Sequence, residues 1–149
     1  MTIIRDLSLL DPKFAAICKR LDERLTAAYE TGVTKTCFKV FETYRDPARQ
    51  ADLFAKGTTK ARAFASAHQL GLACDFVPYL TAEEAAELSN RIGERVWPGW
   101  NWHSSNDYRF LKTQALAVGL VVPIAWDPCH VEHPNWQAFR KCQKQHFGY

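Results

Sequence analysis

Apolar and polar positions along the chain follow two different periods. From Asp11-Pro12 to Gly32, apolar residues recur every three or four positions, with Asp as a cap and Pro in the first turn, which predicts an amphipathic helix. Asp46-Pro47 repeats this start signal, and Thr81 begins a capping-box pattern. These signals predict helices at five places: between Asp11 and Gly32, Asp46 and Gly57, Thr81 and Ile92, Asp107 and Val118, and after Asn135.

Short runs rich in β-branched and aromatic residues lie between the predicted helices. They predict strands at 36–41, 72–77, 121–125 and 130–132, whereas 58–67 and 96–105 are predicted to be irregular. Interleaved helices and short strands indicate an α+β fold, in which helices flank a small antiparallel sheet. Because no repeat, low-complexity tract or linker divides the sequence, we expect one domain over residues 1–149.

Composition and charge narrow the classes of function. Apolar residues make up 47% of the 149 and charged residues 23%, which is an ordinary globular balance. The net charge is only +3 and no run of Lys or Arg is present, so a dedicated nucleic-acid surface is not expected. The first ten residues contain no long apolar stretch behind a basic start, so we expect neither a signal peptide nor a membrane span. We therefore expect the protein to be located in the cytoplasm.

Cysteine and tryptophan are the two unusual features of the composition. Five widely scattered cysteines without a Cys-x-x-Cys pair favour free, mostly buried thiols in a reducing compartment over a disulfide scaffold. Three of the five tryptophans, Trp97, Trp100 and Trp102, are close in sequence and could line a groove, although scatter over core and surface is commoner.

A carboxylate inside a predicted apolar strand is the main candidate for chemistry. Asp75 lies within Leu-Ala-Cys-Asp-Phe-Val, where an unpaired charge is costly and needs a cation, donors or a metal. His68 precedes this strand, and Gly71 permits a turn that returns the imidazole to the carboxylate. If strands 72–77 and 130–132 pair, His68, Asp75 and His130 can converge on one cation. Two imidazoles and one carboxylate suit zinc and leave one coordination position open.

Other interpretations of these residues remain open at this point. A lone histidine is more often a hydrogen-bonded core or surface residue than a metal ligand. Cys74 and Cys129 each adjoin a proposed ligand, so a thiolate site is an alternative, but strand alternation turns both cysteines away from the metal face. A Cys–His nucleophile is weakly supported because no histidine is fixed beside either thiol. We expect both cysteines to be packing residues.

Three motifs together resemble the VanY-like zinc peptidases, which include D-alanyl-D-alanine carboxypeptidases and dipeptidases and phage L-alanyl-D-glutamate endolysins. The motifs are Thr-Tyr-Arg-Asp at 43–46, Ser-x-His-x-x-Gly-x-Ala-x-Asp at 66–75 and Asp-x-x-His-x-Glu at 127–132. The resemblance covers about residues 40–136 and implies the VanY-like, hedgehog-like fold.

The resemblance implies roles for individual residues. It implies that His68, Asp75 and His130 bind one zinc ion, that Asp127 is the general base for metal-activated water, and that Arg45 holds the substrate carbonyl or its developing oxyanion. The alternatives are that Asp127 is an exposed cap before Pro128, and that Arg45 forms a surface ion pair with Asp46 or Glu42. Positions contacting the substrate or supporting the ligands are expected at Ser66, Gln50, Glu132 and His133.

Two of these supporting residues lie close to the last ligand in sequence. Glu132 is expected to orient a ligand imidazole or to hold Arg45. His133 faces away from His130 on a regular strand, unless a bulge or Pro134 turns the chain.

The implied function is zinc-dependent hydrolysis of the peptidoglycan stem peptide. Asp-x-x-His resembles the endolysin branch, whereas the carboxypeptidase branch commonly has Glu. We therefore expect a monomeric phage or prophage endolysin that cleaves the L-Ala–D-Glu bond, without a separate cell-wall-binding domain and without stable membrane association. It would stay in the host cytoplasm until it is released to the wall or periplasm. The alternatives are a D,D-carboxypeptidase or dipeptidase acting on D-Ala termini, and a non-catalytic phage structural or wall-binding domain.

Overall fold

A computed structural model describes residues 2–61, 65–102 and 105–147. The longest helix, α1 (Pro12–Glu30), begins as the sequence predicts, because the Asp11 carboxylate accepts hydrogen bonds from the backbone N–H groups of Lys13 and Phe14. The other helices begin within two residues of their predicted starts; they are α2 (Pro47–Ala55), α3 (Ala82–Ile92), α4 (Ser105–Ala117) and α5 (Trp136–Phe147). Two short 3-10 helices are added, η1 (Leu7–Leu9) and η2 (Ala67–Leu70).

One strand organises the sheet. This strand, β2 (Ala73–Leu80), pairs antiparallel with β1 (Phe38–Glu42), β3 (Gly99–Trp100) and β4 (His130–Glu132). The predicted α+β class with a small antiparallel sheet is confirmed. The strand predicted at 72–77 extends to Leu80, and a two-residue strand lies in the segment predicted to be irregular.

The strand predicted at 121–125 is wrong. Only Val121 pairs there, as an isolated antiparallel bridge with Glu132. Pro123 follows two residues later and lacks the backbone N–H that a continued ladder needs. The segment therefore leaves the sheet and leads into the turn before His130.

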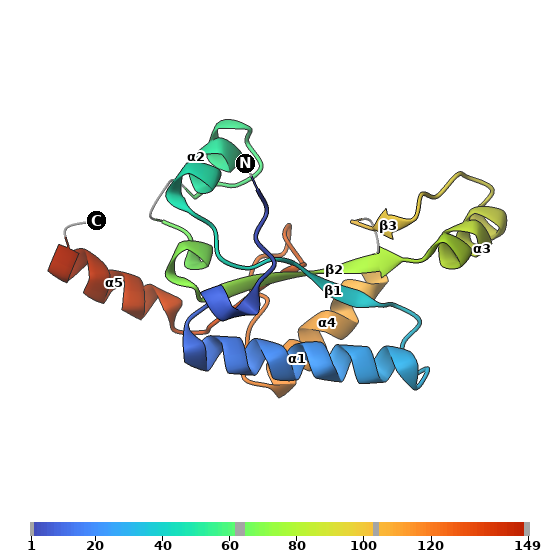
Figure 1. Cartoon of the computed structure of the whole chain (residues 1–149), viewed down its shortest axis with the longest axis horizontal. Helices are drawn as coiled ribbons and strands as arrows, with labels where there is room; N and C mark the ends of the chain where they lie inside the picture. Colours follow the sequence, from blue (N-terminus) through green and yellow to red (C-terminus); the bar gives the residue numbers. More distant parts are fainter. Residues whose placement is uncertain (1, 62–64, 103–104, 148–149) are drawn as a thin grey trace.

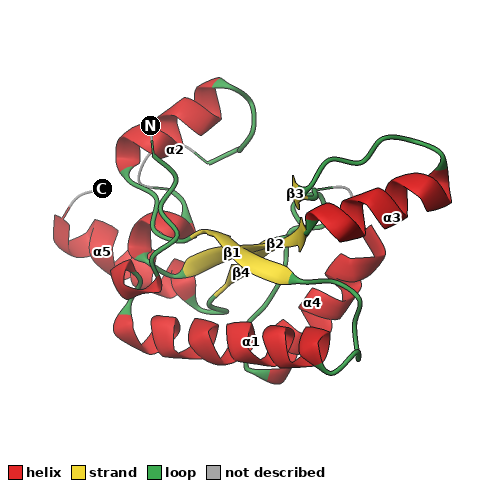
Figure 2. Ribbon diagram, turned by 45° about the vertical axis from the view of Figure 1, so that its right-hand side comes forward, coloured by secondary structure: helices red, strands yellow, loops and turns green. Residues whose placement is uncertain are grey.

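The hydrophobic core lies between one face of the sheet and two helices. Figures 1 and 2 show α1 and α4 on the same side of the sheet, with α2 on the other side. Phe14 and Leu21 of α1 and Leu111 of α4 pack with Phe76 of β2 and Val131 of β4, and each side chain is at most 1% exposed. All five cysteines are free, with Cys18, Cys74 and Cys129 buried, Cys37 half-buried and Cys142 exposed. Helix packing on one face leaves the other face of the sheet available for a site.

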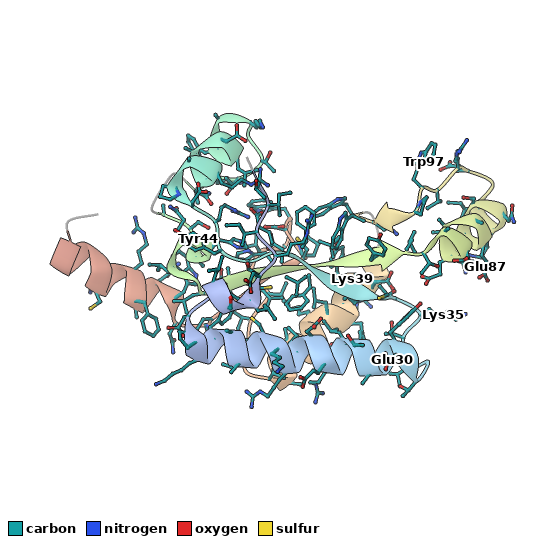
Figure 3. The ribbon with its side chains drawn as sticks, viewed as in Figure 1. Glu30, Lys35, Lys39, Tyr44, Glu87 and Trp97 are labelled. Carbon is teal, nitrogen blue, oxygen red and sulfur yellow. The ribbon has the colours of Figure 1, made fainter. Side chains whose placement is uncertain are left out.

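The clustered tryptophans do line a groove. Trp97, Trp100 and Trp102 surround a volume of about 550 Å³ together with Leu88 and Ile92 of α3. Figure 3 shows Trp97 on the connection between α3 and β3, directed away from the core. Within the described ranges, no helix is long and apolar enough to cross a membrane.

Candidate metal centre

Strand pairing brings the three predicted ligands together. In the β2–β4 ladder Asp75 lies directly opposite His130, as the hypothesis of paired strands required. His68 comes from η2, just before β2. Gly71 ends η2 in the left-handed conformation (φ +69°) and its N–H bonds to the His68 carbonyl, which turns the chain back toward the sheet. The local turn at Gly71 and the long-range pairing of β2 with β4 thus bring the three side chains to one place.

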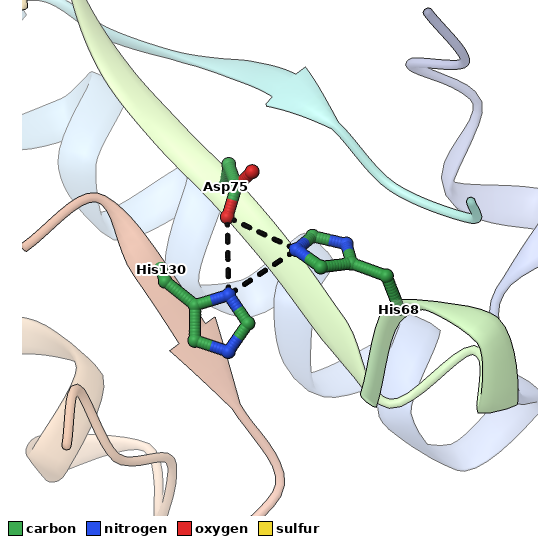
Figure 4. Close-up of side chains that lie close together, drawn as sticks. All are labelled: His68, Asp75 and His130. Carbon is green, nitrogen blue, oxygen red and sulfur yellow. Dashed lines mark hydrogen bonds and ion pairs between the residues drawn. The ribbon is translucent and has the colours of Figure 1, made fainter. Parts of the chain in front are cut away.

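Three potential ligand atoms form a nearly equilateral triangle (Figure 4). The Asp75 Oδ1 lies 3.2 Å from His68 Nε2 and 3.3 Å from His130 Nδ1, and the two ring nitrogens are 3.2 Å apart. Ligands bound tetrahedrally at zinc–nitrogen and zinc–oxygen distances lie about 3.3 Å from one another. The triangle therefore matches one face of a zinc tetrahedron, and all three residues are buried.

The outer nitrogen of each imidazole has a hydrogen-bond partner. His68 Nδ1 lies 2.7 Å from the Thr43 carbonyl oxygen, which can only accept, so this nitrogen donates. His130 Nε2 lies 2.7 Å from the Glu132 carboxylate and donates to it. In the neutral imidazoles these bonds leave His68 Nε2 and His130 Nδ1 with lone pairs directed at the centre of the triangle.

The electrostatics of the triangle favour a cation. The Asp75 Oδ1 is buried and has no well-aligned hydrogen-bond donor among the described residues. Burial by itself raises the pKa of Asp75, but the nearby ring nitrogens of His68 and His130, which carry positive charge when protonated, outweigh burial and hold that pKa well below its usual range. Burial lowers the pKa of His130, whereas hydrogen bonds to Asp75 and Glu132 raise it to about 10. The buried negative charge of Asp75, together with the two ring nitrogens, therefore favours a cation at this point, either a proton or a metal ion.

Arg45 is buried beside the triangle rather than exposed. Its Nη2 lies 3.0 Å from Glu42 Oε2 and 3.6 Å from Asp75 Oδ2, and its Nη1 donates to Gln50 Oε1 at 2.9 Å. The alternative of an ion pair with Glu42 is thus correct as a contact, but the pair is buried and lies within the site. Asp46 instead caps α2 by accepting from the Arg49 N–H.

Asp127 and the two histidines of the metal triangle line the same cavity. The residues that line this cavity of about 140 Å³ include Arg45, Ser66, His68, Asp127, His130 and Glu132, and also Lys60 and Trp126. Asp127 is half-buried and its Oδ1 accepts a hydrogen bond from the Cys129 thiol at 3.3 Å, so it is not an exposed cap. Burial, and then the negative charge of Asp75, raise the pKa of Asp127 above its usual value. A raised pKa suits a carboxyl group that exchanges protons near neutral pH.

Of the remaining predicted residues, Ser66, Gln50 and Glu132 contact other residues of the site, whereas His133 does not. Ser66 caps η2 by accepting from the His68 N–H at 3.3 Å, and Gln50 joins Arg45 to the Ala61 carbonyl. The Glu132 carboxylate accepts a hydrogen bond from His130 Nε2 at 2.7 Å, a contact compatible with one of its two expected roles, the orientation of a ligand imidazole. His133 does not line this cavity.

The His133 ring packs away from the triangle because strand alternation points it to the opposite face. It lies edge-on to Phe14 and Phe139, with centroid separations of 6.5 Å and 5.6 Å, and its Nδ1 accepts from the Asn135 N–H. The expected contribution of His133 to substrate binding or ligand support is therefore not supported by its position.

Two contributors to the site escaped the sequence reasoning. The Thr43 carbonyl has no sequence signal, since every residue carries one. The sequence predicts Glu42 only as a surface partner of Arg45, although its position three residues before Arg45 is a signal for the buried contact that the structure shows.

Comparisons with known proteins establish the fold. No protein-family model matches the sequence, and no curated protein is significantly similar to it. Among solved structures, the L-Ala D-Glu endopeptidase ChiX of Serratia marcescens is similar, with a TM-score of 0.52, 20% identity, and coverage of 89% of this chain and 86% of that one. The D,D-pentapeptidase VanY of a VanB-type vancomycin resistance cassette, in complex with Zn(II), gives a TM-score of 0.52 at 19% identity, covering 93% and 79%.

The LD-carboxypeptidase LdcB, whose structure concerns peptidoglycan recognition, gives a TM-score of 0.52 at 17% identity, covering 92% of this chain and 64% of that one. These neighbours differ in the bond they cleave but share one architecture. The chain therefore has the VanY-like peptidase fold.

Proposed function

We propose that this protein is a zinc-dependent peptidase that hydrolyses the stem peptide of peptidoglycan. The observation that supports it most directly is the triangle of His68, Asp75 and His130, in which inward-facing donor atoms lie at the spacing of zinc ligands. The two histidines of the triangle line a cavity that Asp127 and Arg45 also line. Metal ligands, a base and a cation around one space are the components of a hydrolytic zinc site.

One zinc ion fits the donor set best. Two imidazoles and one carboxylate are a common zinc ligand set, and three protein ligands leave a position open toward the cavity. The VanY neighbour binds Zn(II), which supports the same choice here. When bound, the ion would supply polarisation of the substrate carbonyl and a lowered pKa of water.

Asp127 is proposed as the general base. Its carboxylate faces the same cavity as the triangle, so it can accept a proton from the attacking water and return it to the leaving amine. Burial keeps its pKa above that of an ordinary aspartate, which makes this return of the proton easier. Cys129 holds Asp127 Oδ1 by a hydrogen bond and leaves the other carboxylate oxygen for this exchange.

Arg45 is proposed to stabilise negative charge on the substrate oxygen. Its guanidinium lines the cavity, and Glu42 and Gln50 hold it there. Because it is already in place before substrate arrives, little reorganisation is required when charge develops.

The proposed bond is L-Ala–D-Glu. Support comes from the Asp-x-x-His motif and from the likeness to ChiX, an L-Ala D-Glu endopeptidase. Extending this proposal, the protein acts as a monomeric phage or prophage endolysin that reaches the wall after release from the cytoplasm. A D,D-carboxypeptidase is the second candidate, because Lys60 lines the cavity and its ammonium could bind a terminal carboxylate.

Mass spectrometry of purified peptidoglycan digested with zinc-loaded protein tests these proposals. New N-terminal D-Glu peptides support the endopeptidase, and released D-Ala selects the carboxypeptidase. Asp127→Ala should give neither product. Asp52→Ala removes an acid of an exposed ion pair with Lys56 and should digest like the wild type. Zinc binding without any cleavage contradicts the proposed activity and favours a binding domain.

A further inference from the structure

Glu42 is a buried acid for which the proposed reaction has no direct use. It is 2% exposed, at the end of β1. Its Oε2 accepts from Arg45 Nη2 at 3.0 Å and its Oε1 accepts from Arg49 Nε at 3.1 Å. A buried carboxylate needs its two guanidinium partners, because removing either side of the pair would leave a charge in the interior unpaired, which is costly.

An irregularity in β1 places Glu42 next to a metal ligand. The register with β2 shifts between Val40 and Glu42, so that Glu42 lies opposite Asp75. Two carboxylates facing each other across an antiparallel pair repel one another. The Arg45 guanidinium lies beside both, with the same Nη2 at 3.0 Å from Glu42 and 3.6 Å from Asp75.

The two distances indicate which carboxylate holds Arg45. At 3.0 Å the contact with Glu42 is a charge-assisted hydrogen bond, whereas 3.6 Å to Asp75 is an ion pair without one. Without Glu42, Asp75 would be the nearest anion available to Arg45. Closer pairing there would withdraw negative charge from the metal ligand, and would add positive charge beside the metal.

We propose that Glu42 is a positioning residue that restrains Arg45, so that Asp75 stays available to the metal while the guanidinium stays at the cavity. This inference rests on the proposed zinc site. Glu42 acts through Arg45 and touches neither substrate nor metal. In the order Arg49, Glu42, Arg45, Asp75, positive and negative charges alternate, so that each carboxylate lies next to a guanidinium; Arg49 is half-buried and the other three residues are buried.

A double-mutant cycle with Zn²⁺ alone as the ligand tests this role. The dissociation constant for Zn²⁺, measured by competition with a chromophoric chelator, should rise about 10- to 100-fold in Glu42→Gln, because the change releases Arg45, the ion-pair partner of Asp75, and disturbing such a partner of a metal ligand has effects of this size. In an Arg45→Met background the same Glu42→Gln change should alter zinc affinity by no more than about twofold, because the group it restrains is gone.

Arg49→Gln is the matched control. It removes the other partner of Glu42 from the same buried network and leaves Arg45 with Glu42, so zinc affinity should change by no more than about twofold. Thermal melting of each metal-free variant verifies folding. If Glu42→Gln does not fold, the cycle is repeated with Glu42→Asp, which keeps the charge but retracts it from Arg45 and should still weaken zinc binding.

Three results overturn the inference. They are unchanged zinc affinity in Glu42→Gln, an equal loss in the Arg45→Met background, and an equal loss in Arg49→Gln. The first removes the link to the metal, the second shows that Glu42 does not act through Arg45, and the third reduces Glu42 to general structural support. Failure of the proposed function is distinct: wild type would then bind no Zn²⁺, or would bind it and cleave no peptide.

Discussion

Substituting Gly71 by alanine tests how the turn between η2 and β2 builds the metal site. Gly71 adopts φ +69°, and a Cβ placed on it would lie 2.8 Å from the Asp11 nitrogen and 3.2 Å from the Leu10 Cα. Both atoms belong to the backbone just before α1, where Leu10 ends η1 and Asp11 caps α1, and they cannot move aside alone. The close approach is itself part of the fold, since the Asp11 N–H donates to the Gly71 carbonyl.

The expected loss of stability has two parts. The left-handed conformation costs an alanine about 1–2 kcal/mol. Forcing a methyl group into occupied space adds about 1–3 kcal/mol. Gly93 is the matched control, because it ends α3 with φ +72° and its Cβ would meet nothing within 4 Å.

Gly71→Ala should therefore lower the free energy of unfolding by about 2 kcal/mol more than Gly93→Ala. For a chain of this length that difference is roughly 4–8 °C in Tm. Urea denaturation and calorimetry of the metal-free proteins measure it. Zinc affinity should also fall in Gly71→Ala only, because His68 moves with the turn. Equal stability losses in both variants would refute the argument that the clash with the start of α1 matters.

Four further changes have expected outcomes. Asp127→Asn should lower kcat by about 10²–10⁴ while zinc affinity is retained; lost zinc binding would instead make Asp127 a structural residue. Hydrolysis needs ionised Asp127, so kcat/KM falls as the pH drops through the pKa of Asp127. Because the Cys129 hydrogen bond lowers that pKa, Cys129→Ala should move the acid limb of the kcat/KM profile to higher pH. A shift to lower pH contradicts the assignment of Asp127 as the general base. Glu132→Ala should weaken zinc binding about 10- to 100-fold, with His133→Ala as an unaffected control in the same competition assay. Leu21→Ala should destabilise the fold by about 2–5 kcal/mol, measured by urea denaturation, because its side chain is fully buried; a loss below 1 kcal/mol contradicts its place in the core.

The sequence was most informative where the physical cause is local. Asp11 and Asp46 cap helices through hydrogen bonds to backbone groups two or three residues away, so the sequence alone places these helix starts. Gly71 follows the same logic, since its left-handed φ is a property of one residue. The strand predicted from apolar composition at 121–125 is wrong because Pro123 has no backbone N–H with which to continue the ladder beyond Val121.

The metal triangle could be predicted only in part, because its residues can be identified locally but their convergence depends on long-range strand pairing. Sequence reasoning found its three residues because a buried Asp75 in an apolar strand demands a partner, but their convergence was conditional on β2 pairing with β4. This pairing joins segments more than fifty residues apart, and the sequence of neither segment predicts which strand it will pair with. Only the folded chain decides it.

The sequence by itself determined the helix starts, the α+β class and the candidate ligands, because these follow from short-range hydrogen bonding, periodicity and the cost of a buried charge. Only the tertiary structure decided which imidazole nitrogens face inward, through the Thr43 carbonyl and the Glu132 carboxylate. It also turned His133 away and placed Glu42 beside Asp75 by a one-residue shift in register. These outcomes depend on backbone atoms and strand register, which residue identity does not specify.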